Sequence, residues 1–223
     1  MNYSMVKSLI LKDWYFQHKT ILLSLIGGAV SLGIVAFGGR PGFTIGLILL
    51  VTNLGLISAL TVIGNTLGER ENQTLAFAMS LPISYLEYTT SKILGNLLIF
   101  VPFWLALVAG CLGLIVAAPT IHGLFAFTVV MAVEILVGTC LMIAVALVTE
   151  SKGWTIAAMV TGNLAINVVG YLVAHIPGIG NGMWGTAIQW RPAATISLLV
   201  EFALIALMLG GAFLIQSRKK DFI

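Results

Sequence analysis

Charged side chains are scarce in this sequence. Only 9% of its 223 residues are Asp, Glu, Lys or Arg, whereas 59% are hydrophobic. A soluble domain carries about 25% charged residues, so 8 acids and 11 bases are too few to cover a water-exposed surface of this size. The composition argues against a soluble enzyme and against a nucleic-acid-binding protein, and it favours a single integral membrane domain over residues 1–223.

Cysteine and histidine are scarce as well. Cys111 and Cys140 lie in apolar runs without CxxC spacing, so we expect both to pack as small hydrophobic side chains. The three histidines are dispersed along the chain, and no metal site is expected. The first nineteen residues contain no uninterrupted apolar run of the kind that a cleavable signal peptide needs. We therefore expect the first span to serve as an uncleaved anchor.

A nucleotide-binding loop is absent from the sequence. The Walker A pattern Gly-x4-Gly-Lys-Ser/Thr does not occur, and the glycine-rich residues 178–183 lack its phosphate-binding lysine. No pair of a nucleophile and a base is visible either. We expect no catalytic residue and no cofactor in this chain.

Six apolar stretches are long enough to cross a bilayer, which requires about 20 residues in a helix. They are residues 20–38, 43–67, 93–118, 123–149, 153–175 and 193–216. The predicted fold is an all-α integral membrane domain with six transmembrane helices. Residues 3–19 are too polar to span and place Leu9, Ile10 and Trp14 on one helical face. This pattern predicts an N-terminal interfacial amphipathic helix, the alternative being a frayed tail.

The basic residues are distributed unevenly between the two sides of this topology. Only Arg40 and Arg191 fall on one side. By the positive-inside rule, the richer side is cytoplasmic, so the sequence predicts a multi-pass membrane protein with both termini in the cytoplasm. The cytoplasmic set is Lys7, Lys12, Lys19, Arg70, Lys92, Lys152, Arg218, Lys219 and Lys220.

Residues 68–92, here called the connector, join the second and third spans. After a charged start the connector places Leu75, Ala78 and Met79 on one helical face that has no lipid to contact. Pro82 ends this short helix, and Ser84 with Glu87 forms a capping box for the next helix. A short amphipathic helix in the cytosol indicates a protein partner, the alternative being a loop on the membrane surface.

These features together resemble the ABC-2 type permeases, most closely short bacterial members such as the membrane subunits that export phenol-soluble modulins. The resemblance is carried by the six spans, by Leu11-Lys12-Asp13-Trp14, by Ser80-Leu81-Pro82-Ile83-Ser84 and by Ser91-Lys92. The chain departs from the family at Gln73, where many members have glycine.

The resemblance implies that the connector inserts into a groove of a cytosolic ABC ATPase. Two ATPase subunits, which bind ATP and Mg²⁺, would then face two permease chains, identical or homologous to each other. Residues 176–192 would form a re-entrant segment on the outer side. The residues implied to couple with the ATPase are Glu69, Arg70, Glu71, Thr74, Leu75, Ala78, Met79, Ser80, Leu81 and Pro82.

Polar side chains inside the spans are candidates for a substrate pathway. The fifth span carries a stripe with a four-residue repeat, and the second span repeats this pattern less strongly. In the family these two spans line the route between the permease halves, whereas packing against other helices is the alternative. The candidates on the two spans are Asn53, Thr61, Asn65, Asn163, Asn167 and Tyr171.

Glu134 and Glu201 lie deep in the fourth and sixth spans, with no base at comparable depth. Each is expected to belong to the substrate pathway or, as a neutral acid, to hold two helices together. The predicted function is a permease subunit that exports an amphipathic substrate, such as a peptide, an antibiotic or a lipid-like molecule. The alternative function is an ion-coupled secondary transporter or channel that uses the two acids.

Overall fold

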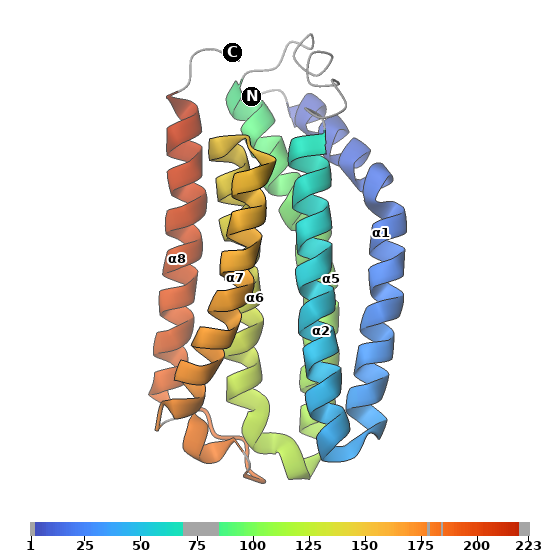
Figure 1. The fold of residues 1–223 in the computed structure, drawn as a ribbon, viewed down its shortest axis with the longest axis vertical. Coiled ribbons are helices and arrows are strands. Elements are labelled where there is room, and N and C mark those ends of the chain that lie inside the picture. The colour runs from blue at the N-terminus through green and yellow to red at the C-terminus, as the bar shows by residue number, and fades with distance from the viewer. Residues whose placement is uncertain (1–2, 69–84, 178, 184, 219–223) are drawn as a thin grey trace.

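The computed structural model describes residues 3–68, 85–177, 179–183 and 185–218. This part of the chain is helical and contains no strand. Figure 1 shows one bundle with α1 and α8 at opposite edges. The elements are α1 (Tyr3–Phe37), α2 (Gly39–Val62), the π-helix η1 (Ile63–Leu67), α5 (Tyr85–Ala117), the 3-10 helix η2 (Pro119–Leu124), α6 (Phe125–Thr149), α7 (Lys152–His175), the 3-10 helix η3 (Gly180–Gly182) and α8 (Pro192–Ser217).

In the part of the chain that the structure describes, six helices are long and apolar enough to cross a membrane, which confirms the prediction of an all-α membrane protein with six spans. Their candidate spans are Lys7–Phe37, Pro41–Leu67, Leu86–Ala117, Pro119–Thr149, Lys152–His175 and Pro192–Ser217. In Figure 1 the start of α1 and the end of α8 lie at the same end of the bundle, as an even number of spans requires.

The N-terminal region differs from the sequence prediction. Residues 3–19 are not a separate helix, because α1 continues from Tyr3 to Phe37 without a break. No glycine or proline precedes Gly27 in this helix, so nothing in the local sequence interrupts its backbone hydrogen bonds. Figure 1 shows the N-terminal part of α1 inclined to the remainder of the helix.

The tight connection between α1 and α2 depends on glycine. Gly39 has a φ of +60°, a conformation that costs glycine little. At Gly38 a Cβ atom would lie 2.5 Å from the Cα of Gly42, so only glycine fits there. Because this turn is so short, α2 begins at Gly39. The predicted second span begins later, at residue 43.

α6 is the central helix of the bundle. In the most apolar 18-residue stretch of the span that contains α6, 67% of the residues are buried. The corresponding share in the other five candidate spans is 11% to 44%. The largest buried cluster joins α1, α2, α5 and α6 and includes Leu54, Ile57, Phe100 and Ile135. Trp104 of α5 also donates a 2.8 Å hydrogen bond to the carbonyl oxygen of Ala132. Dispersion contacts and such interhelical bonds replace the hydrophobic effect as the force that joins helices in lipid.

The segment between α7 and α8 packs on the start of α6. Ile179 is buried with residues of α6, α7 and α8, and the Gly123 amide donates a 2.9 Å bond to the carbonyl oxygen of Gly185. The described residues of the predicted re-entrant segment contain one 3-10 turn, η3. Their depth relative to the lipid stays a prediction.

Candidate functional site

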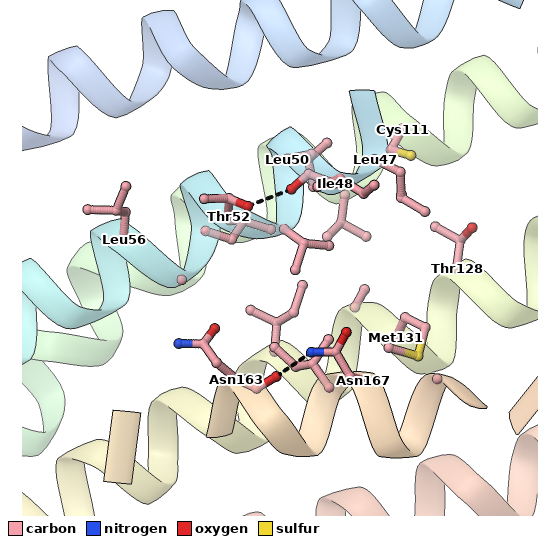
Figure 2. Close-up of a pocket in the computed structure, with 18 of the residues that line it drawn as sticks. Leu47, Ile48, Leu50, Thr52, Leu56, Cys111, Thr128, Met131, Asn163 and Asn167 are labelled. Carbon is pink, nitrogen blue, oxygen red and sulfur yellow. Dashed lines mark hydrogen bonds between the residues drawn. The ribbon is translucent and has the colours of Figure 1, made fainter. Parts of the chain in front are cut away.

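The main candidate site is a cavity of about 630 Å³ that is lined by residues of α2, α5, α6 and α7. Figure 2 shows α2 and α7 as opposite walls, with α6 passing between them. The wall contributed by α2 consists mainly of leucine, isoleucine and valine side chains between Leu47 and Ala59. The polar lining side chains are Thr52, Thr128, Asn163 and Asn167. An apolar cavity with a few polar groups is the usual form of a site for small molecules.

The two asparagines of α7 face this cavity one helical turn apart. Asn163 donates its amide nitrogen to the carbonyl oxygen of Met159 at 3.1 Å, and Asn167 donates to the carbonyl oxygen of Asn163 at 2.9 Å. Both side chains are exposed in the described chain. Since the bonds to the helix use the amide nitrogens, the oxygens Oδ1 remain as acceptors for a ligand that carries an N–H or O–H group.

The threonines of the cavity differ in how their hydroxyl groups are satisfied. Thr52 donates to the carbonyl oxygen of Ile48 at 2.8 Å. Thr128 is buried on α6, and its Oγ1 has no hydrogen-bond partner among the described residues. A buried hydroxyl without a partner is costly. Because this oxygen is itself buried, the described structure does not offer the Thr128 hydroxyl to a ligand in the cavity.

Three pathway candidates of the second span do not line this cavity. Asn53 Nδ2 donates a 2.8 Å bond to the carbonyl oxygen of Ser24 in α1. Thr61 is fully buried and donates to carbonyl oxygens of its own helix. Asn65 is buried and bonds to Gln17 and Asn96. Asn53 and Asn65 thus join helices through their side chains, whereas Thr61 is satisfied within α2.

Tyr171 also lies away from the lining of the cavity. Its side chain is 65% exposed, and its ring centroid is 4.2 Å from that of His175, one turn later on α7. The polar stripe predicted on the fifth span therefore does not form one continuous surface. Asn163 and Asn167 face the cavity, whereas Tyr171 stacks at the end of the helix.

Glu134 and Glu201, which the sequence presents as isolated acids, meet between α6 and α8. The helices run parallel: Ala126 and Ala194 belong to one buried cluster near one end, and the Gln216 amide bonds to the carbonyl oxygen of Leu147 near the other. The two acids fall between these contacts at about the same height. Both are only 5% exposed.

The two carboxyl groups are therefore buried at a similar depth on adjacent helices. In addition, Oε2 of Glu201 is buried without a hydrogen-bond partner among the described residues. The sequence could not reveal this pairing because the fourth and sixth spans are not consecutive. One sequence feature could have indicated this proximity: each acid lies at a similar distance from the start of its helix.

The predicted ATPase-coupling residues, from Glu69 to Pro82, lie outside the described residues. Within the described ranges, no group of three or more His, Cys, Asp or Glu side chains lies together in a way that could hold a metal ion. Comparisons with protein-family models, with curated proteins and with solved structures found no match.

Proposed function

We propose that this chain is the membrane-spanning permease subunit of an ATP-driven exporter of the ABC-2 type. Its substrate would be an amphipathic molecule, such as a peptide, an antibiotic or a lipid-like compound. The observation that carries the proposal is the cavity between α2 and α7, which combines an apolar wall with a short row of amide oxygens. An amphipathic ligand would place its apolar part against α2 and α6 and its donor groups against Asn163 and Asn167.

The energy for export would come from partner chains. Two cytosolic ABC ATPase subunits would bind ATP and Mg²⁺, and a second permease chain, identical or homologous, would complete the membrane part. The connector between η1 and α5 would contact the ATPase, so that ATP-driven closure of the ATPase dimer moves α2 and α5. Transport then requires that the substrate bind the inward-open and outward-open states with different affinities.

The test begins with a search of the neighbouring genes for an ABC ATPase, followed by reconstitution of the chain in vesicles with that ATPase. We expect the two proteins to co-purify and an amphipathic peptide to stimulate ATP hydrolysis, whereas a hydrophilic peptide of the same length would not. Accumulation of the amphipathic peptide should require ATP on the cytoplasmic side of the permease. Transport that proceeds without any ATPase would contradict the proposal.

A second candidate function is an ion-coupled transporter or channel, favoured by the pairing of Glu134 and Glu201. Buried carboxyl groups in a bundle often mark ion or proton pathways. Neither acid is among the residues that line the cavity, although Met131, which does line it, lies one turn before Glu134 on α6. Vesicles that contain the chain alone and carry a proton or Na⁺ gradient separate the two functions, because only the second predicts flux there.

A further inference from the structure

A buried ion pair joins α1 to α5 beside the connector. The ammonium group of Lys92 lies 3.0 Å and 3.3 Å from the two carboxylate oxygens of Asp13. Lys92 is fully buried and Asp13 is 4% exposed. The same ammonium group lies 5.6 Å from the centroid of the Tyr88 ring, close enough for a cation–π interaction.

A chain of amide side chains extends from this ion pair to the end of α2. Asn96 donates to the carbonyl oxygen of Lys92 at 2.8 Å and to the hydroxyl of Thr66 at 3.1 Å. Asn65 donates to Asn96 at 3.4 Å, and Gln17 donates to Asn65 at 3.2 Å. We call Asp13, Gln17, Asn65, Asn96 and Lys92 the polar clamp. It joins α1, η1 and α5, the last two of which flank residues 69–84.

Two glycines, Gly64 and Gly95, leave room for side chains of the polar clamp. A Cβ atom at Gly64 would lie 2.4 Å from the amide nitrogen of Gln17, and one at Gly95 would lie 3.4 Å from a carboxylate oxygen of Asp13. Gly64 belongs to η1, a π-helical turn in which Asn65, Thr66 and Leu67 are all buried. π-helical turns of this kind occur frequently at functional sites.

We propose that the polar clamp positions the connector by holding α1 in one register against α5 and η1. This role rests on the function proposed above. A buried ion pair adds little net stability, because desolvation of both charges offsets their attraction, but its directional bonds can select one register. Apolar side chains of similar size would fill the same space and allow the helices to slide. The clamp would therefore make the two ends of the connector move with α1 as one unit.

The test separates register from stability with one double variant. Asp13→Leu with Lys92→Met removes both charges and keeps apolar volume between the helices. Thermal unfolding can be followed with a thiol-reactive dye, since Cys111 and Cys140 are free and buried in the folded chain. Coupling is measured as peptide-stimulated ATP hydrolysis in the reconstituted complex. Lys7→Gln, at an exposed position on α1, is the matched control.

We expect the double variant to unfold within about 3 °C of the wild type and to lose peptide stimulation by about tenfold. The charge reversal Asp13→Lys with Lys92→Asp should recover more than half of the stimulation, and Lys7→Gln should leave both measurements unchanged. If the double variant unfolds early, Gln17→Met carries the test with an expected loss of about threefold.

The outcomes distinguish this role from the proposed function itself. If the double variant is folded and still shows wild-type stimulation of ATP hydrolysis, the positioning role is overturned and the exporter assignment stays intact. If the double variant unfolds early, wild-type stimulation in Gln17→Met has the same meaning. A wild-type chain that neither binds the ATPase nor responds to peptide would overturn the exporter assignment, and the positioning role with it.

Discussion

Asn167 of α7 donates its side-chain amide to the carbonyl oxygen of Asn163, one turn earlier, at 2.9 Å. The bond holds the Asn167 side chain along the helix, and Figure 2 shows both asparagines on the side of α7 that faces α2. Opposite them, a Cβ atom at Gly55 would lie 3.5 Å from Oδ1 of Asn163. The amide oxygens of α7 thus face a surface of α2 that is mainly apolar.

This relationship predicts how substitutions in the cavity act. Asn163→Leu and Asn167→Leu should each reduce peptide-stimulated ATP hydrolysis by about tenfold, because a buried donor of the ligand would lose its acceptor. Assembly with the ATPase should not change. Thr161→Val, at an exposed position of α7 outside the cavity, serves as the control. Wild-type stimulation in both asparagine variants would mean that the stripe only packs helices.

The connector prediction depends on the sequence alone. If Leu75, Met79 and Leu81 form an apolar surface that docks on the ATPase, Met79→Glu should weaken co-purification by about thirtyfold or more, since a buried anchor contributes about 2 kcal/mol or more. Neutralising Glu69 should cost less and depend on salt concentration. Unchanged co-purification and transport for Met79→Glu would remove the main local support for the exporter assignment.

The orientation can be tested at the two ends of α7. A single cysteine at position 181 should react with an impermeant reagent from outside the cell, whereas one at position 152 should react only after permeabilisation. Position 181 is preferable to 180, because a Cβ atom at Gly180 would lie 1.8 Å from the carbonyl oxygen of Ala174. Labelling of position 152 in intact cells would reverse the predicted orientation.

The paired acids lead to a prediction about stability. Glu201→Gln should raise the midpoint of thermal unfolding, because a neutral amide is less costly to bury than a carboxyl group whose Oε2 lacks a hydrogen-bond partner among the described residues and which shares the contact of α6 and α8 with a second acid. Glu134→Gln should act in the same direction. A lowered midpoint in both variants, together with stabilisation of the wild type by Na⁺, would instead favour the ion-coupled candidate.

Two glycines form a matched pair for testing the packing of the outer segment. A Cβ atom at Gly123 would lie 1.9 Å from the carbonyl oxygen of Gly182, whereas one at Gly113 would meet nothing within 4 Å. Gly123→Ala should therefore destabilise the chain by about 2 kcal/mol or more. Gly113→Ala should stabilise it by about 0.5–1 kcal/mol, the usual gain inside a helix. Equal midpoints would contradict the close approach of η2 to the segment before α8.

The sequence by itself determined the number of membrane helices and their approximate limits. A span requires about 20 apolar residues with all backbone groups bonded within the segment, and this requirement is local. The continuous α1 was missed because Asp13 and Lys12 made residues 3–19 look like a surface helix. The sequence also did not show that Asp13 is buried against Lys92, which lies far away in the sequence. Whether residues 3–19 lie at the membrane surface stays a prediction.

Only the tertiary structure decided which polar residues meet. In a membrane chain, residues that face lipid and residues that face other helices are equally apolar, so hydropathy does not reveal the rotation of a helix or its neighbours. The stripe on α7 was predictable from its repeat, but its separation into cavity and end-stacking residues was not. The pairing of Glu134 with Glu201 depends on the parallel contact of α6 and α8, which follows from the packing of the whole bundle.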